Sequence, residues 1–246
     1  MNLLVDIGNT RIKWAVADKD GGVVTSEVGE LTASQLTTLV AQYNLQRAIC
    51  SSTRGAVDEV LALLEECVAE VIWFTPQTPV PIAIAYATPD TLGRDRVAAA
   101  VGAVARYPGR DCLVVDFGTA LTLDFVSKEG VFHGGSISLG VSNRFRALQE
   151  YTATLPLCEA SEEASEQLFG CSTREAIEQG VMNSVQFELE GYMTRLQEKN
   201  GDLCVIFTGG EAKYFAKRIK NTIFAEPNLV FYGLNRILEY NATAKK

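Results

Sequence analysis

Two aspartate-glycine turns, each following an apolar run, have the residue types and spacing best suited to chemistry. The first lies in LLVDIGNTRIKWAV at residues 3–16, and LVVDFGTALTLDFV at residues 113–126 repeats its plan. Glycine lets a ligand approach the backbone, Thr and Asn donate short hydrogen bonds, and an aspartate at a strand end holds a cation that balances phosphate charge. The repetition predicts two phosphate-binding hairpins, and two such hairpins facing each other would hold one nucleotide between two domains.

D-x-G turns also occur in ordinary β-hairpins, and one copy alone favours that structural explanation. The duplication favours function, and a third segment adds to it. VIFTGGEAKYF at residues 205–215 combines an apolar strand, a Gly-Gly turn and a helix start. This arrangement suits a nucleoside or a phosphate bound against helix amides.

A further candidate site lies between the two turns. YATPDTLGRDRVAAAVGA at residues 86–103 places Asp95 between Arg94 and Arg96, where a helix is expected to begin. A carboxylate there is able to accept the proton of a hydroxyl that attacks a γ-phosphate, and an adjacent guanidinium binds a carboxylate or a phosphoryl oxygen. The structural alternative is a helix N-terminal aspartate flanked by solvated arginines.

Alternating strands and helices are expected to position these residues. Apolar periodicity and turn residues predict strands at residues 3–6, 12–17, 47–52, 70–75, 112–117, 121–126, 131–139, 203–210 and 228–233. Helical spacing is found at residues 31–43, 56–70, 94–106, 141–153, 173–199 and 211–219, and a final helix follows residue 233. The Pro-rich passage from Pro76 to Pro89 is expected to be extended or looped.

Composition limits the class of protein. The chain has 246 residues, enough for two domains, and its 22 Lys and Arg against 30 Asp and Glu give a net charge of −8. That sign disfavours non-specific attraction to nucleic acid or to an anionic membrane. The six cysteines are scattered without a CxxC pair, and no signal peptide or spanning helix is indicated. We therefore expect a cytoplasmic protein.

The order D-x-G-N-T, D-x-G-T-A and T-G-G resembles the phosphate and adenosine motifs of the acetate and sugar kinase, heat-shock chaperone and actin superfamily. The resemblance covers nearly the whole chain. It implies an α/β fold of two duplicated ribonuclease-H-like (actin-like ATPase) domains, each a mixed sheet with flanking helices. Residues 1–109 would carry the first phosphate turn and the acceptor loop, and residues 110–246 the second turn and the nucleoside site. Many reactions share this fold, so it does not identify the substrate.

A closer resemblance narrows the substrate. Y-x-x-P-x-x-L-G-x-D-R at residues 86–96, joined to D-x-G-N-T-x-x-K at residues 6–13 and D-x-G-T-A at residues 116–120, is similar to a type III pantothenate kinase. This resemblance implies phosphorylation of pantothenate by ATP, the first step of coenzyme A biosynthesis, with Mg²⁺ and with K⁺ or NH₄⁺. STREAIEQGV at residues 172–181 resembles another family segment and implies a homodimer with the substrate site near its interface.

The same resemblance assigns roles to numbered residues. It makes Asp95 the catalytic proton acceptor, Asp116 the ligand of the monovalent cation, and Asp6 the residue that positions Mg²⁺ through water. The implied ATP-binding residues are Asp6, Ile7, Gly8, Asn9, Thr10, Arg11, Ile12, Lys13 and Thr119. The implied pantothenate-binding residues are Tyr86, Gly93, Arg94, Asp95, Arg96 and Thr173.

The chain departs from the family pattern at one position. The family commonly has G-G-x-I-x-P-G, whereas GGSISLG at residues 134–140 has Leu139 in the place of the proline. Proline fixes the backbone, so we expect this substitution to affect the rigidity of the loop and not the chemistry.

Other functions stay open at this stage. In a polyphosphate or nucleoside-phosphate hydrolase of the same superfamily Asp95 would orient water, which leaves Tyr86 and Arg96 without a role. A sugar kinase is disfavoured because the chain lacks the cysteine-rich zinc segment that many of them carry. A non-enzymatic nucleotide sensor is the third class, and the intact Asp6, Asp95 and Asp116 argue against it. Without the family pattern, Arg11 and Lys13 could equally be a solvated strand face.

Overall fold

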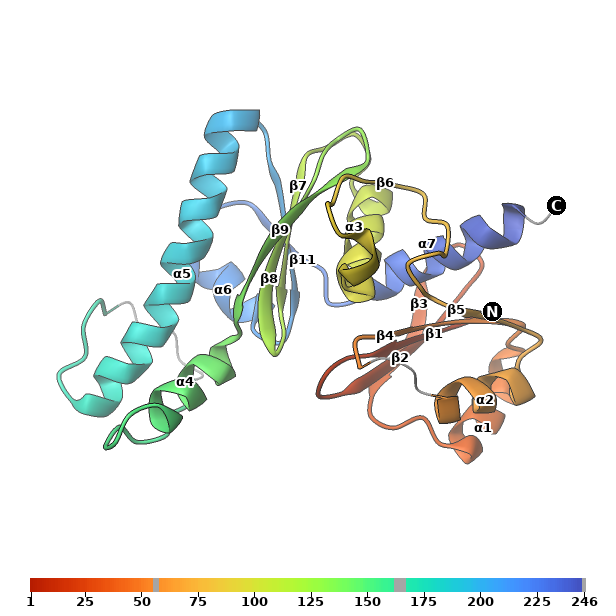
Figure 1. Ribbon diagram of the computed structural model, residues 1–246, viewed down its shortest axis with the longest axis horizontal. Helices are drawn as coiled ribbons and strands as arrows, with labels where there is room; N and C mark the ends of the chain where they lie inside the picture. The colour runs from red at the N-terminus through yellow and green to blue at the C-terminus, as the bar shows by residue number, and fades with distance from the viewer. Residues whose placement is uncertain (55–57, 162–166, 245–246) are drawn as a thin grey trace. The chain divides into compact units, whose positions relative to one another are not determined.

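The computed structural model describes residues 1–54, 58–161 and 167–244. They form two compact units, one containing residues 1–109, 126–134 and 228–246 and the other residues 110–125 and 135–227. Figure 1 shows the helices and strands of both units along the chain.

The first unit is built on a mixed sheet with the strand order β3-β2-β1-β4-β5. Its strands are β1 (Asn2–Ile7), β2 (Ile12–Ala17), β3 (Val23–Val28), β4 (Arg47–Ser52) and β5 (Glu70–Trp73). β1 pairs antiparallel with β2 and parallel with β4. The first D-x-G-N-T segment therefore lies at the carboxyl end of a central strand.

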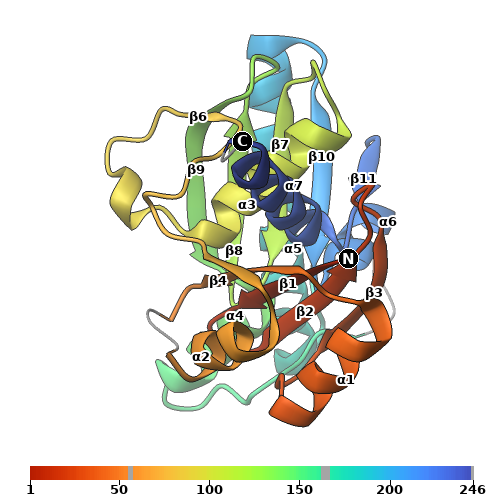
Figure 2. The same cartoon turned by 90° about the vertical axis from the view of Figure 1, so that its right-hand side faces the viewer.

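Helices cover both faces of this sheet. α1 (Ala33–Tyr43) and α2 (Asp58–Cys67) lie on one face, and α3 (Arg94–Arg106) and α7 (Leu229–Ala244) lie on the other (Figures 1 and 2). Side chains alternate along a strand, so Leu3 and Val5 pack in the core with α1 and α2, whereas Leu4 packs with α3 and α7. The same alternation directs Asp6 to the side of α3.

The second unit repeats this plan. Read from its other edge, the strand order β9-β8-β7-β10-β11 matches β3-β2-β1-β4-β5 of the first sheet strand for strand. β10 lies parallel to both β7 and β11, as β4 lies parallel to β1 and β5. The strands are β7 (Cys112–Phe117), β8 (Ala120–Val126), β9 (Val131–Leu139), β10 (Cys204–Gly209) and β11 (Ile223–Ala225). The α/β fold of two mixed sheets with flanking helices, which the family resemblance implies, is confirmed.

One face of this second sheet is covered by α4 (Val141–Glu150), α5 (Thr173–Asn200) and α6 (Ala212–Arg218) (Figure 1). Apolar residues of these helices share a core with β7, β8 and β10. Residues 126–134, where β8 ends and β9 begins, belong to the first unit, and there β9 pairs with the short strand β6 (Ala83–Ile84). A 3-10 turn, η1 (Pro89–Thr91), leads from β6 to α3.

The strand predicted at residues 228–233 is wrong, because NLVFYG forms the start of α7. Its valine and aromatic residues favour a strand by composition, but Phe231 and Leu234 have helical spacing and are buried in the core with α3. The two helices approach so closely that a β-carbon at Gly233 would lie 1.7 Å from the carbonyl oxygen of Ala98. Tertiary packing through glycine therefore overrides local propensity here.

The domain bounds 1–109 and 110–246 stay a prediction. By contacts, residues 126–134 and α7 group with residues 1–109. Polar contacts add to the packing of α7 on α3. Asn2 Nδ2 donates to Asn235 Oδ1 and to Glu239 Oε1, both at 2.8 Å, and Arg47 forms an ion pair with Glu239 at 2.5 Å. The C-terminal helix thus returns to the unit in which the chain begins.

Most other predicted elements are found within a few residues of their expected bounds, and the predictions for α3 and β4 are confirmed residue for residue. The helix predicted at residues 56–70 is found as α2, and its residues 56 and 57 lie outside the described residues. β3 and β11 were not predicted. Within the described part of the chain, no helix combines the length and apolarity needed to cross a membrane.

Candidate active site

Asp6 lies at the centre of a polar cluster at the edge of the first sheet. The strand register pairs it with Lys13 on β2 and with Ser51 on β4. Ser51 Oγ donates to Asp6 Oδ1 at 2.9 Å, and Asp6 is only 6 % exposed. A buried carboxylate with a hydroxyl partner is thus held at the end of a central strand.

The pKa of Asp6 is raised above its ordinary value, chiefly because burial disfavours the charged form. The negative charge of Asp95 raises it further, while the Ser51 hydrogen bond and the positive charge of Lys13 act in the opposite direction. The structure therefore brings together, within one unit, the carboxylates predicted to position a cation and to accept a proton.

Asp95 is held in the first turn of α3. The backbone N of Arg96 donates to Asp95 Oδ1 at 2.9 Å, and the carboxylate is half-buried. A β-carbon at Gly93 would lie 2.5 Å from this same oxygen, so glycine leaves the space that the carboxylate occupies. The G-x-D spacing therefore fixes the direction of Asp95.

Arg96 and Tyr86 form a cluster with Phe132. The Arg96 guanidinium lies 6.0 Å from the Tyr86 ring centroid and 5.8 Å from the Phe132 ring centroid, and the two rings meet edge to face at 6.1 Å. The backbone N of Ala85 donates to the Phe132 carbonyl at 2.9 Å, which fixes the loop that carries Tyr86. Arg96 and Phe132 are buried and Tyr86 is half-buried, and binding of a substrate by Arg96 and Tyr86 stays a prediction.

Arg94 takes part in the fold of the acceptor loop. Its Nη2 donates to the Pro89 carbonyl at 2.9 Å, its Nε donates to the Leu92 carbonyl at 3.0 Å, and its guanidinium lies over the Phe74 ring. Burial lowers the pKa of Arg94, and the charges of two aspartates raise it. These contacts fix the entry to α3, and contact of Arg94 with a substrate stays a prediction.

The first phosphate turn is exposed from Asn9 to Arg11, and its Gly8 N donates to the Arg11 carbonyl at 3.0 Å. One residue that contacts this turn, Arg54, was not identified from the sequence. Arg54 Nε donates to the Gly8 carbonyl at 2.6 Å. Arg54 and Ser51 both lie at or just after the end of the apolar strand RAICSS, and β4 runs parallel to β1, so polar residues there reach the same sheet edge.

In the second unit, the T-G-G segment lies against the D-F-G-T-A turn. Gly210 N donates to the Phe117 carbonyl at 2.9 Å. A β-carbon at Gly209, whose φ is +90°, would lie 2.6 Å from Asp116 Oδ1. The structure thus joins two motifs that are about ninety residues apart in the chain, as Asp116 and Thr208 are also paired in the β7–β10 register.

The turn before α4 supports the other side of the second phosphate turn. The Thr119 carbonyl accepts hydrogen bonds from Gly140 N at 3.1 Å and from Asn143 Nδ2 at 2.9 Å. Leu139, which stands in the place of the family proline, is half-exposed, and its carbonyl accepts a bond from Arg144 Nε at 2.8 Å.

The other guanidinium nitrogens of Arg144 bind residues of β9 and α5. Its Nη1 donates to Ser184 Oγ at 3.0 Å, its Nη2 donates to Ser138 Oγ at 3.1 Å, and it forms an ion pair with Glu188 of α5. This network ties the corner between β9 and α4 to α5, so the corner is held by side chains where the family has a proline.

Thr173 is the first residue of α5 and is exposed. The helix is capped by Ser172, whose Oγ accepts a bond from Glu175 N at 3.3 Å. Asp116, Thr119 and Thr173 all belong to the second unit, and their roles in ligand binding stay predictions.

The residues present fit a magnesium ion that is held mainly by a nucleotide. Among residues 1–54, 58–161 and 167–244, no cluster of three or more His, Cys, Asp or Glu is suited to hold a metal. Mg²⁺ in phosphate-transfer sites uses one or two carboxylates together with water and substrate phosphates, and the buried Asp6 provides such a carboxylate. In the second unit, Asp116 Oδ1 and the Phe117 carbonyl oxygen both lie within 3 Å of the place where a Gly209 β-carbon would stand. Binding of a monovalent cation by Asp116 stays a prediction.

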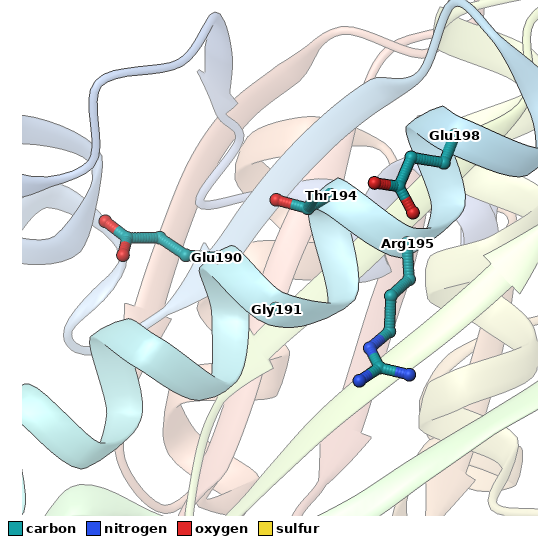
Figure 3. Close-up of a pocket in the computed structure, with 5 residues that line it drawn as sticks. All are labelled: Glu190, Gly191, Thr194, Arg195 and Glu198. Atoms are coloured by element: carbon teal, nitrogen blue, oxygen red, sulfur yellow. The ribbon is translucent and has the colours of Figure 1, made fainter.

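A surface hollow elsewhere does not coincide with these residues. It lies on the second unit and is lined by Glu190, Gly191, Thr194, Arg195 and Glu198. Figure 3 shows that all of them rise from α5. One helix face does not enclose a ligand as binding sites commonly do, so we do not place the active site there.

Comparison with known proteins gives consistent findings. Residues 2–195 match the model of a family described as type III pantothenate kinase. A type III pantothenate kinase of Phocaeicola vulgatus is 41% identical over 241 residues, which cover 98% of this chain and 99% of the relative.

Two solved structures share the fold. A Campylobacter jejuni protein described as a candidate Baf family transcriptional activator has a TM-score of 0.61 at 24% identity, and the match covers 98% of this chain and 99% of that one. The activator of the 2-hydroxyisocaproyl-CoA dehydratase from Clostridium difficile, solved with bound ADPNP, has a TM-score of 0.53 at 14% identity, with coverage of 99% and 97%. At these identities the likeness concerns the fold alone.

Proposed function

Because the chain belongs to the type III pantothenate kinase family, we propose that it transfers the γ-phosphoryl group of ATP to a hydroxyl of pantothenate, the first step of coenzyme A biosynthesis. Family membership makes the chain a phosphotransferase. The observation that supports the proposal is the buried Asp6, bound by Ser51 at the carboxyl end of β1 and close enough to Asp95 to feel its charge. Arg96, the next residue to Asp95, lies near the Tyr86 ring.

Asp95 is proposed as the proton acceptor. Its carboxylate is held by the Arg96 backbone at the start of α3 and is half-buried, so it keeps a fixed direction toward an incoming hydroxyl. The pantothenate hydroxyl would attack the γ-phosphorus in line while its proton passes to Asp95. A carboxylate base is sufficient for this chemistry because the phosphoryl group, and not the protein, forms and loses the covalent bonds.

Arg96 and Tyr86 are proposed to bind pantothenate, with the loop of Gly93 and Arg94 at its side. The guanidinium of Arg96 supplies a charge for anionic oxygens, and the Tyr86 ring supplies apolar contact for the carbon skeleton. Thr173 is proposed to contact pantothenate across the interface of a homodimer, as the family resemblance implies.

The nucleotide is proposed to bind the two phosphate turns. Gly8, Thr10 and Thr119 would donate to phosphate oxygens, within the wider loop from Asp6 to Lys13. Bound Mg²⁺ would neutralise phosphate charge during transfer. Asp6 would hold it through water, and Asp116 would hold K⁺ or NH₄⁺. The cytoplasmic location also remains a prediction, which rests on the six cysteines, all of them free thiols.

ADP release with ATP, Mg²⁺ and K⁺, measured with and without pantothenate, tests this function. Asp95→Asn removes the proton acceptor, so we expect its pantothenate-dependent rate to fall by about 100-fold or more. Asp20→Asn, at an exposed turn of the same unit, is the matched control and is expected to keep the wild-type rate. ADP release that needs no pantothenate would instead support a hydrolase, and no release in potassium or ammonium buffer would support a nucleotide sensor.

The proposed dimer has a separate test. Mixing the Asp95→Asn variant with a Thr173→Ala variant allows mixed dimers to form. If Thr173 acts across the interface, mixed dimers contain one site with both residues intact, so activity should rise above the mean of the two variants. A mixture that shows only that mean would contradict the proposal.

A further inference from the structure

Arg54 lies two residues beyond β4, at the sheet edge that carries the first phosphate turn. Thr53 N donates to the Ile7 carbonyl at 3.0 Å, which extends the pairing of β4 with β1. The backbone N of Arg54 donates to Ser52 Oγ at 3.1 Å, and its Nε donates to the Gly8 carbonyl at 2.6 Å. The side chain is therefore attached to the phosphate turn by its inner nitrogen.

The outer nitrogens of Arg54 are not used by the fold. Within residues 1–54, 58–161 and 167–244, no acceptor binds its Nη1 or Nη2, and the residue is exposed. Arg94 shows the contrast, since its Nη2 donates to the Pro89 carbonyl. The Nε of Arg54 is thus bound by the fold, while its two Nη atoms are available to a ligand. In arginine these two atoms match the spacing of phosphate oxygens.

The charges of this site favour a cation at that position. The charge of Asp95 acts unfavourably on Asp6 before any nucleotide binds, and the charge of Lys13 acts favourably on it. A triphosphate adds more negative charge, and ligands of open α/β sheets bind at the carboxyl ends of the parallel strands, where Arg54 lies. A guanidinium beside Gly8 would offset this charge where the phosphoryl group is transferred.

We propose that Arg54 is a catalytic residue whose Nη atoms bind the terminal phosphate oxygens of ATP while its Nε stays on the Gly8 carbonyl. This inference rests on the proposed function and adds to it a residue outside the family motifs. In the transfer, the pantothenate oxygen forms a bond to the γ-phosphorus and the bond to the β-phosphate oxygen of ADP breaks. The hydroxyl proton passes to Asp95, and Arg54 keeps its protons throughout, stabilising the charge on the transferred group.

The test compares Arg54→Ala and Arg54→Lys with Arg236→Ala, a control on an exposed position of α7 in the same unit. We expect Arg54→Ala to lower kcat by about 100-fold or more. Arg54→Lys should recover about tenfold of that loss, because lysine places one point charge where arginine places a fork. Arg236→Ala should keep the wild-type kcat, and added guanidinium should raise the rate of Arg54→Ala only.

Binding measurements distinguish two roles of Arg54, namely contact with the phosphates of ATP and structural support of the turn at Gly8. In calorimetry without pantothenate, Arg54→Ala should bind ATP about tenfold more weakly while its affinity for AMP and its Tm stay at wild-type values. Equal losses for ATP and AMP, a lowered Tm, or a kcat within threefold of wild type would overturn the proposal. A wild-type protein that fails to phosphorylate pantothenate would refute the proposed function alone, since the ATP and AMP comparison still tests Arg54.

Discussion

The two D-x-G turns share a sequence plan but are held by different means. Around the first, side chains of β4 and its following loop make the contacts, with Ser51 bound to the aspartate and Arg54 bound to the glycine carbonyl. Around the second, backbone groups meet directly, and Gly140 and Gly209 allow two neighbouring segments to approach the turn. The two copies of the motif are therefore stabilised by different contacts, side chains around the first turn and backbone groups around the second.

The glycines inside the turns differ from the glycines beside the second turn in how close the neighbouring backbone lies. A β-carbon would lie 3.2 Å from a backbone oxygen at Gly8 and 3.4 Å from one at Gly118. At Gly140 and Gly209 the corresponding distances are 2.1 and 2.4 Å, which no backbone can tolerate without moving. We infer that the glycines inside the turns serve the approach of a ligand, whereas the glycines beside the second turn serve the fold.

Gly140→Ala should have the largest effect on stability. The added methyl group meets backbone that no rotamer change can relieve, so we expect a loss of about 3 kcal/mol in the free energy of unfolding. Gly8→Ala, inside the first turn, should stay within about 1 kcal/mol of wild type while weakening nucleotide binding. Urea unfolding of the two variants makes the comparison, and equal losses would show that the two turns are held alike.

Arg144→Met should have a smaller effect. It keeps the volume of the side chain but leaves the partly buried Glu188 without its cation, so we expect a loss of about 1–3 kcal/mol in the free energy of unfolding. Arg146→Met, on an exposed position of the same helix, is the matched control and should change little. If Arg144→Met unfolds at the same urea concentration as the control, side-chain support of the β9–α4 corner is refuted.

Asp6→Asn should change the free energy of unfolding least, and it should stabilise the protein where the other variants destabilise it. The folded pKa of Asp6 lies above its ordinary value of 3.8, so the unfolded state ionises first as pH rises and wild-type stability falls through that window. Asparagine removes this loss and can still accept the Ser51 hydrogen bond. The margin by which the variant exceeds wild type should therefore grow as pH rises above about 4, and the variant should lose kinase activity. Thermal melts of both proteins at a series of pH values above about 4 measure this margin. A margin that is constant or that shrinks with pH would contradict the raised pKa of Asp6.

Sequence alone predicted the elements whose signals are local. The apolar run before Asp6 and the alanine-rich segment after Gly93 carry their own strand and helix patterns, and both are found. The strand predicted at residues 228–233 failed because its conformation depends on the close approach of Gly233 to Ala98, which is remote in the chain.

The candidate site shows the same limit. Asp6 and Asp95 were identified by motif, and the shared face that joins them follows from strand alternation and from the packing of α3 on the sheet. Arg54 carries no motif. It becomes visible only when the parallel pairing of β4 with β1 brings it beside Gly8.

The most direct test of the central claim is the identity of the product. Purified protein is incubated with ATP, Mg²⁺, K⁺ and pantothenate, and the acceptor is examined by mass spectrometry and phosphorus NMR. We expect pantothenate to gain one phosphoryl group for each ADP formed, and we expect Asp95→Asn to form neither product at a comparable rate. Formation of ADP and inorganic phosphate with unmodified pantothenate would contradict this claim.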